Sequence, residues 1–338
     1  MRSWYEAEAQ GFLNRLFSHL DEARVRLEPH WDIDHICFRV ESRERYETRK
    51  IEISKFANLL IESKVKGRMI STFQLREPII FSDYAIDVLE LPAPKLGKVV
   101  NEGFEHIEVV CDQTFAELQT KYERLDLDTG GMNKVFNSEL EIIFGPENIK
   151  FHHSSLASVV RLELQKKVWT AIEKSEVLQT LAPFFPLIAG TLPLGLAVEE
   201  SDVDVLVTVA DPLDFEKICR SRFSQWPGFE IRAALVRGEA STIVKFVCEN
   251  IPFEIFGQRT PSVRQWGWKH FQIEERLLKL GGLSFMSRIQ DLRKQGLETE
   301  PAFAKCLELV GDPYEELARL HSLSNAELHS FAIAKIEG

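Results

Sequence analysis

Two stretches of the N-terminal half repeat one order of secondary-structure patterns, and this repeat restricts the possible folds more than any other feature. Residues 33–40 alternate like a strand, residues 43–64 are charged and helical in pattern, and two strand patterns follow, the second at residues 84–92. The order then returns with a strand at 103–110, a helix, and a hairpin-like pair within 139–152. The pattern predicts an internal repeat of two β-α-β-β-β modules.

The length of the chain and a change of pattern near residue 160 predict two domains. The chain has 338 residues, 44% of them hydrophobic, which is enough for two cores. An amphipathic helix opens the chain and ends before Pro29. We expect an α+β protein with domains at residues 1–160 and 161–338, the second with a mixed sheet and a helical tail.

Charge and cysteine usage restrict the partners of the chain. A formal net charge of −11 argues against strong binding of duplex nucleic acid, which needs a basic face. The five cysteines are scattered and predict neither a disulfide framework nor a cysteine zinc site. The chain has no signal peptide pattern and no run of about 18 apolar residues. We therefore expect a cytoplasmic protein, away from membranes, that acts on a small-molecule substrate or a nucleotide.

Four possible metal ligands fall at matching places in the two modules. His35 and His106 lie early in the first strand of each module, and Glu90 and His152 lie near the end of the last strand. If the modules curl into one cleft, these side chains converge. Imidazole with carboxylate suits Zn, Fe(II), Mn or Ni, and a catalytic metal keeps one coordination position open.

Several neighbouring residues compete for the same roles. A single strand histidine is usually structural, and only the paired placement favours ligands. Glu105 and Glu108 are rivals of His106; alternation puts Glu108 on the histidine face and Glu105 on the other. His153 is a rival of His152.

The segments DHICFRV, LREPI, VLELPAP, EGFEHIEVV and NIKFHHSSL give residues from about 8 to 160 a family resemblance. This half resembles the YecM family, whose fold is similar to the vicinal-oxygen-chelate enzymes such as glyoxalase I and extradiol dioxygenases. The resemblance implies a metal-binding cleft with ligands His35, Glu90, His106 and His152, although glyoxalase-like members typically have Glu at the fourth position. It also implies chelation of adjacent substrate oxygens by the metal.

The C-terminal half contains a turn followed by paired carboxylates in LIAGTLPLGLAVEESDVDVLVTV. Gly190 and Thr191 follow an apolar strand, Gly195 lies further on, and Asp202 and Asp204 open the next strand. Carboxylates two residues apart on a strand point to one face, where they can share Mg²⁺ ions. The turn can present backbone N–H groups to a nucleotide phosphate.

A third carboxylate completes such a site, and Glu254 in NIPFEIFG is the best candidate. This half resembles the DNA polymerase β-type nucleotidyltransferase superfamily, with its Gly-Ser turn, Asp-x-Asp strand and distant third carboxylate. Residues 187–338 also look like an uncharacterised bacterial family placed in that superfamily. The resemblance implies Mg²⁺-dependent nucleotidyl transfer, with Thr191 in place of the usual Ser and no basic residue in the turn.

Other residues of this half leave alternatives open. Arg232, Arg237 and Lys245 can neutralise phosphate or lie on the surface, and His270 can line the cleft or belong to the core. Trp266 and Trp268 can stack on a base or pack inside. Two functions from different classes fit the sequence. One is an enzyme with both sites active, and the other is a protein that senses a metal or nucleotide with inactive sites.

Overall fold

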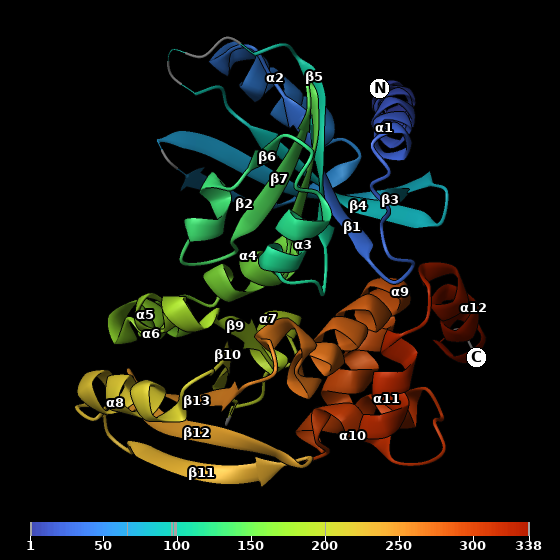
Figure 1. The fold of residues 1–338 in the computed structure, drawn as a ribbon. Coiled ribbons are helices and arrows are strands. Elements are labelled where there is room, and N and C mark those ends of the chain that lie inside the picture. Colours follow the sequence, from blue (N-terminus) through green and yellow to red (C-terminus); the bar gives the residue numbers. More distant parts are fainter. Residues whose placement is uncertain (1, 66, 96, 98–99, 200, 337–338) are drawn as a thin grey trace. The chain divides into compact units, whose positions relative to one another are not determined.

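The structure is a computed structural model and describes residues 2–65, 67–95, 97, 100–199 and 201–336. The chain divides into two compact units, Met1–Val160 and Arg161–Gly338 (Figure 1). Each unit contains one mixed sheet, and helices end the chain, so the predicted α+β class is confirmed. Within the described ranges, every helix is too short or too polar to cross a membrane.

The first unit is built on an eight-stranded sheet of order β2-β3-β4-β1-β5-β8-β7-β6. β1 runs parallel to β4, β5 runs parallel to β8, and β1 pairs antiparallel with β5. The order is therefore symmetric about the β1–β5 pair, and each half follows the order β-α-β-β-β. The strands are β1 (Asp32–Arg39), β2 (Ala57–Val65), β3 (Arg68–Phe81), β4 (Tyr84–Pro92), β5 (Gly103–Val110), β6 (Leu127–Asp128), β7 (Glu139–Phe144) and β8 (Glu147–His152).

Helices complete this unit. α1 packs against β3 and β5, where the ring of Phe104 lies 6.0 Å from Phe12 on the helix and 5.0 Å from Phe38 on β1. Phe38 lies on the face of the sheet that packs against α1. Because side chains alternate along a strand, the residues next to Phe38 point to the opposite face. The helices are α1 (Arg2–Glu22), α2 (Arg43–Ile53), α3 (Phe115–Lys121), the 3-10 helix η1 (Gly130–Asn133) and α4 (Leu156–Leu164), which contains the boundary between the units.

The predicted helix at residues 43–64 is wrong in its second half. α2 ends at Ile53, and Ala57–Val65 forms β2 at the edge of the sheet. Glu62 and Lys64 lie on this strand, and charged side chains are common on edge strands because they discourage pairing with other chains. Their charge gave the segment the appearance of a solvated helix.

The second unit contains a five-stranded sheet of order β11-β12-β13-β10-β9, in which only β10 and β13 pair in parallel among the described strands. The segment 243–257, which has one continuous strand pattern, is a hairpin that turns at Glu249 and Asn250, where φ is 51° and 62°. The strands are β9 (Leu187–Ala189), β10 (Val203–Thr208), β11 (Glu230–Val236), β12 (Glu239–Cys248) and β13 (Ile251–Gln258).

The long helix α9 organises the C-terminal part of this unit. It changes direction at Gly282, and its buried residues Trp268 and Phe271 belong to a core shared with the helices that follow. Pro at N1 and an Asp cap start both α8 and α11. The helices are α5 (Lys166–Ser175), α6 (Val177–Leu181), η2 (Ala182–Phe184), α7 (Thr191–Leu194), α8 (Pro212–Phe223), η3 (Ser262–Arg264), α9 (Trp266–Lys294), α10 (Thr299–Cys306), α11 (Pro313–His321) and α12 (Asn325–Ile336).

We expect Phe38→Ala to destabilise the first unit strongly. The Phe38 ring is fully buried between α1 and the sheet, and truncation of such a ring costs about 3–5 kcal/mol through lost burial and the cavity left behind. Denaturant unfolding of the full chain measures the change. Ile80→Ala, at a side chain that is 57% exposed, is the control and should change stability by less than about 1 kcal/mol. Equal effects of the two substitutions would contradict this packing.

Candidate functional site

A carboxyl residue directly precedes a histidine on each central strand of the first unit, as Asp34-His35 on β1 and Glu105-His106 on β5. Neighbouring side chains of a regular strand point to opposite faces. The register between β1 and β5 shifts at Asp34 and again at Glu105, which marks a β-bulge at each place. Each bulge allows the carboxylate to reach the ring that follows it, so Glu105 does not lie on the face opposite His106 as alternation predicts.

These carboxylates fix the orientation of the two imidazole rings. Nδ1 of His35 lies 2.7 Å from Oδ2 of Asp34, and Nδ1 of His106 lies 3.0 Å from Oε2 of Glu105. A carboxylate accepts the Nδ1 proton, so the neutral ring presents the lone pair of Nε2 on its other side. Metal-binding histidines are usually held in this way by a carboxylate behind them.

The two Nε2 atoms meet a third carboxylate, that of Glu108. Nε2 of His35 is 3.6 Å and Nε2 of His106 is 3.3 Å from Oε1 of Glu108. The ligand atoms of the three residues all lie within 4.8 Å of one another, and the three side chains are buried. We call His35, His106 and Glu108 the histidine centre. Two imidazoles and one carboxylate on one side of an ion are the donor set of non-haem Fe(II) sites, and they also suit Mn and Zn.

The buried ammonium of Lys150 lies at the histidine centre. Its Nζ donates to Oε1 of Glu108 at 3.0 Å and lies 3.2 Å from Nε2 of His106. Burial alone would lower the pKa of Lys150, but the carboxylates of Glu108, Glu139 and others raise it above its usual value. Burial would likewise raise the pKa of Glu108, but Lys150 and His35 hold it well below its usual value. An ion bound here therefore competes with an ammonium group.

The orientation of His35 leaves its Nε2 open to a ligand. Among the described residues, this buried Nε2 has no hydrogen bond, since the Glu108 carboxylate is 3.6 Å away, and Nε2 of His152 has none either. Burial alone would lower the pKa of His35, but Glu108 and Asp34 raise it. A buried ring nitrogen without a partner costs free energy unless something binds it.

The four expected ligands do not meet at one point. Glu90 is paired in register with Cys37 and groups with Cys37 and His106, whereas His152 groups with Asp34 and His35. Within the described residues, no such group joins all four. Glu90 and His152 come from β4 and β8, the strands that flank the β1–β5 pair on its opposite sides. Of the rivals, His153 stacks on Phe115 with ring centroids 4.5 Å apart and belongs to none of these groups.

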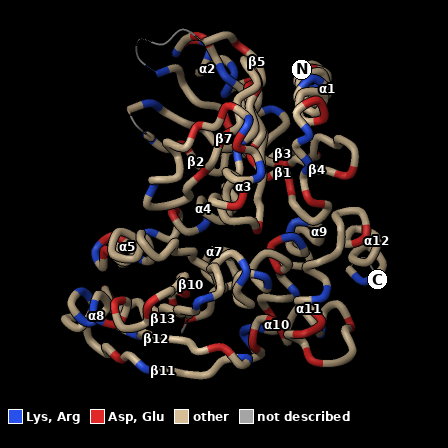
Figure 2. Tube along the Cα trace, viewed as in Figure 1, with Lys and Arg blue, Asp and Glu red and all other residues tan. Residues whose placement is uncertain are grey.

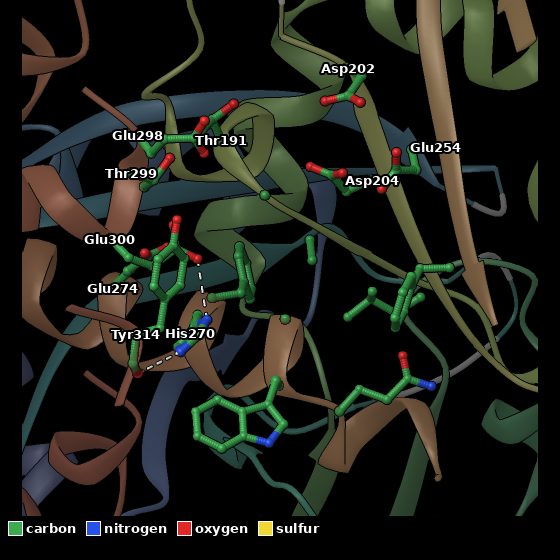
Figure 3. Close-up of a pocket in the computed structure, with 18 of the residues that line it drawn as sticks. Thr191, Asp202, Asp204, Glu254, His270, Glu274, Glu298, Thr299, Glu300 and Tyr314 are labelled. Atoms are coloured by element: carbon green, nitrogen blue, oxygen red, sulfur yellow. Dashed lines mark hydrogen bonds and ion pairs between the residues drawn. The ribbon is translucent and has the colours of Figure 1, made fainter. Parts of the chain in front are cut away.

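In the second unit, Asp202, Asp204 and Glu254 line one cavity of about 900 Å³ (Figure 3). Asp204 on β10 is directly opposite Glu254 on the parallel strand β13. Their ligand atoms are not grouped as tightly as those of the histidine centre, because none of the three-residue groups within 4.8 Å among the described residues lies in this unit.

Gly190 makes room for the Asp204 carboxylate. Its φ is 75°, and a Cβ atom there would lie 2.0 Å from Oδ2 of Asp204. Any other residue at this position would be strained and would displace the carboxylate. Thr191 also lines the cavity and donates its hydroxyl proton to Oγ of Ser201 at 3.1 Å. Gly195, predicted with Gly190 and Thr191 to bind the nucleotide, ends the four-residue helix α7 with a φ of 73° and is absent from the cavity lining.

The carboxylates of this cavity repel one another. Burial raises the pKa of Asp204 well above its usual value, and the charges of Asp202, Glu254 and Glu300 raise it further. Burial and the charge of Glu254 also raise the pKa of Asp202. The site therefore favours protons or metal cations over an ionised empty state.

The basic and tryptophan candidates of this unit lie in different surroundings. Nζ of Lys245 lies 2.5 Å from Oε2 of Glu254. The Arg237 guanidinium lies 3.6 Å over the ring of Trp266. Arg232 is largely exposed near Glu230. Trp268 is buried in the core.

Sequence reasoning missed the acidic group around His270. Nδ1 of His270 lies 3.2 Å from Oε1 of Glu300, and its Nε2 donates to the carbonyl of Tyr314 at 2.9 Å. Both residues line the cavity, as does Glu274. His270 and Glu274 are four residues apart on α9, a spacing that places them on one helix face. This spacing was the available signal.

Two family models match the chain, one in each unit. Residues 5–155 match the family described as YecM protein, so the predicted resemblance is confirmed. Residues 170–320 match a domain of unknown function (DUF4269). The chain therefore carries a YecM domain followed by a DUF4269 domain.

Two curated proteins are similar to part of the chain. An uncharacterized protein of Haemophilus influenzae is 35% identical over 96 residues, which are 28% of this chain and 50% of that protein. Protein YecM of Escherichia coli (strain K12) is 28% identical over 145 residues, with 38% of this chain and 77% of that protein covered. The chain thus spans half the length of the first relative.

Several solved structures are similar to about half of the chain. Protein EC4020 has a TM-score of 0.41 at 24% identity and covers 47% of this chain and 90% of its own. The Cid1 poly(U) polymerase, in a mutant bound to MgATP, has a TM-score of 0.30 at 15% identity and covers 46% of this chain and 48% of its own. The GLD-2/RNP-8 complex has a TM-score of 0.29 at 10% identity, with 46% and 57% covered.

We expect Mg²⁺ to stabilise the second unit at neutral pH and to lose this effect in acid. A carboxyl whose pKa is raised by folding contributes stability below its unfolded pKa, and this contribution is lost as the pH rises through the folded pKa. The metal-free unit therefore loses stability from about pH 4 upwards as Asp202 and Asp204 ionise. Mg²⁺ binds the ionised form and offsets the loss.

Thermal unfolding of the full chain measures this effect. Millimolar Mg²⁺ at pH 8 should raise the unfolding temperature of the second unit by roughly 2–4 °C for each kcal/mol of binding, and at pH 5 by much less. Asp204→Asn should raise this temperature without Mg²⁺ and remove the response, whereas Asp214→Asn, at an exposed residue of α8, should respond like the wild type. An Mg²⁺ response that survives in Asp204→Asn would contradict the assignment.

Proposed function

We propose that the second unit transfers a nucleotidyl group from a nucleoside triphosphate to an acceptor hydroxyl with the help of Mg²⁺. The observation that carries the proposal is the convergence of Asp202, Asp204 and Glu254 on one cavity, with Gly190 leaving space for the Asp204 carboxylate. The resemblance of residues 187–338 to the polymerase β-type superfamily supports the same reaction.

The residues of the site would each have a defined task. Asp202, Asp204 and Glu254 would hold Mg²⁺, which when bound supplies charge neutralisation for the phosphates and the attacking oxygen. Lys245, paired with Glu254, brings a positive charge beside the carboxylates in place of the basic residue that the turn lacks. Thr191 and the Gly190 backbone line the cavity where the phosphates would lie.

The reaction balances with these groups alone. The acceptor oxygen forms a bond to the α-phosphorus, and the bond from that phosphorus to the oxygen bridging to the β-phosphate breaks. Pyrophosphate leaves with the bridging oxygen, and the acceptor proton passes to a carboxylate of the site. The fixed carboxylates would favour this step by holding the reactants in line.

Transfer of radiolabel tests the proposal. The full chain is incubated with each α-labelled nucleoside triphosphate, Mg²⁺ and the small-molecule fraction of a cell extract. The label that appears on a new compound and the free pyrophosphate are then measured. We expect transfer with at least one nucleotide, and a decrease of about 100-fold or more in Asp202→Asn and Asp204→Asn because each removes a metal ligand. Asp214→Asn is the matched control. Saturable nucleotide binding without any transfer would overturn the proposal and favour nucleotide sensing.

For the first unit we also propose a divalent metal centre held by His35, His106 and Glu108. The unpartnered Nε2 of His35 and the paired carboxylates behind both rings support it. The likeness of the YecM family to vicinal-oxygen-chelate enzymes suggests a substrate with adjacent oxygens. Such a metal would act as a Lewis acid toward that substrate. Metal binding would release protons from the rings and would displace Lys150 from Glu108.

The variant Lys150→Met tests whether the histidine centre binds a metal or is only a network of salt bridges. Without the ammonium, the buried Glu108 loses its closest cationic partner, so we expect the metal-free variant to lose about 3–5 kcal/mol of stability. Added Zn²⁺ or Mn²⁺ should restore this stability, and the purified variant should retain more metal than the wild type in elemental analysis.

Two controls accompany this test. Lys64→Met, at an exposed side chain of β2, should leave stability and metal content unchanged. His35→Ala combined with His106→Ala should abolish the metal response of Lys150→Met. If Zn²⁺ and Mn²⁺ leave Lys150→Met as unstable as before, the centre is a salt-bridge network and holds no metal.

A further inference from the structure

The cavity of the second unit has an acidic end beyond the proposed metal ligands. Figure 3 shows the labelled side chains in two groups, with Asp202, Asp204 and Glu254 in one. The other group contains Glu274, Glu298, Glu300, His270 and Tyr314. The charge of Glu300 acts on both groups, because it raises the pKa of Asp204 in the first and the pKa of Glu274 in the second.

Carboxylates greatly outnumber cationic side chains in the lining. The guanidinium groups are those of Arg237, Arg264 and Arg293, and Arg237 is paired with Glu315. Metal ions at the first group would neutralise only that group. The second group would remain acidic. The carboxyl side chains of the lining are those of Asp202, Asp204, Glu239, Glu254, Glu274, Glu298 and Glu300.

Glu274 is the residue of this group that needs a ligand. Only 3% of its surface is exposed, and among the described residues its Oε1 has no hydrogen-bond partner. Burial raises its pKa well above the usual value, and Glu300 adds to the shift while Arg293 opposes it. A buried carboxyl oxygen without a donor costs free energy that a positively charged donor would recover.

The neighbouring pair of His270 and Glu300 cannot supply that donor. Nε2 of His270 gives its proton to the Tyr314 carbonyl, which can only accept. Nδ1 of His270 faces Oε1 of Glu300 at 3.2 Å. Both ring nitrogens are therefore directed at other groups, and neither is a donor to Glu274.

We propose that the acidic end of this cavity binds an ammonium group of a small organic amine, held between Glu274 and Glu300. If the second unit is a nucleotidyltransferase, this amine belongs to the acceptor, and only that identification rests on the proposed function. A primary ammonium offers three donors and one positive charge, which match two carboxylates.

Other occupants fit these residues less well. A nucleic acid acceptor would bring phosphates to a lining that already has excess negative charge. The cavity of about 900 Å³ is near the upper size for small-molecule sites and can hold a nucleotide and a second small molecule.

A matched pair of ring compounds tests the proposal by calorimetry on the full chain without nucleotide. The probe is 2-deoxystreptamine, a cyclic diamine with hydroxyl groups, and myo-inositol is its uncharged counterpart. We expect the diamine to bind at least about tenfold more tightly than inositol. Equal binding of the two compounds would overturn the proposal.

Substitutions separate the site from general attraction, because acidic residues are spread over the whole chain (Figure 2). Glu274→Gln keeps the side-chain size and should weaken diamine binding about tenfold or more, as should Glu300→Gln. Glu308→Gln, at an exposed residue outside the cavity lining, should leave binding unchanged. Diamine binding that survives Glu274→Gln would overturn the proposal. Thermal unfolding shows that each variant is folded.

The outcome is independent of the transfer reaction. Asp204→Asn should lose nucleotidyl transfer and retain diamine binding. If the wild type binds the diamine through Glu274 but transfers no label, the amine site stands and the proposed function fails. If the wild type transfers label but does not bind the diamine, the proposed function stands and the amine site fails.

Discussion

Carboxylates removed from water impose the main constraint on both units, because a buried negative charge needs a cation, a hydrogen-bond donor or a proton. In the first unit the chain supplies its own cation, since Lys150 contacts Glu108. In the second unit Asp204 faces other carboxylates instead. The first site is therefore neutralised from within, whereas in the second Lys245 pairs with Glu254 and the repulsion at Asp204 remains.

Much of the fold could be predicted from the spacing of apolar residues, which shows which face of a helix or strand is buried. The strands at 84–92 and 103–110 have the predicted bounds because each is flanked by Pro or Gly and alternates cleanly. β2 was missed because an edge strand has the composition of a solvated helix, and the register of β12 on β13 depends on a turn at Glu249 and Asn250 without Gly. Each of these strands pairs with the strand that follows it in a hairpin, and packing in the sheet decides such pairing more than composition does.

The candidate sites divide in the same way. The Asp-x-Asp spacing of Asp202 and Asp204 is local, and so is the Gly190 turn; both lie at the cavity. The grouping of His35 with Glu108 depends on which strands are neighbours, and the contact of Glu105 with His106 depends on a bulge. A bulge adds one residue without any change in composition, so alternation alone assigned Glu105 to the other face. Glu274 required the tertiary position of α9.

The twin bulges give each module one carboxylate–histidine pair, while Glu108 comes from the second module only. Neither module contains the complete centre, since β1 provides one ring and β5 the other ring and the carboxylate. An ion coordinated there would be a cross-link between two modules that also meet through backbone pairing of β1 with β5 and through a shared apolar core. Separation of the modules and release of the ion would then be one cooperative event. The residence time of the ion would therefore depend on the stability of the β1–β5 pairing.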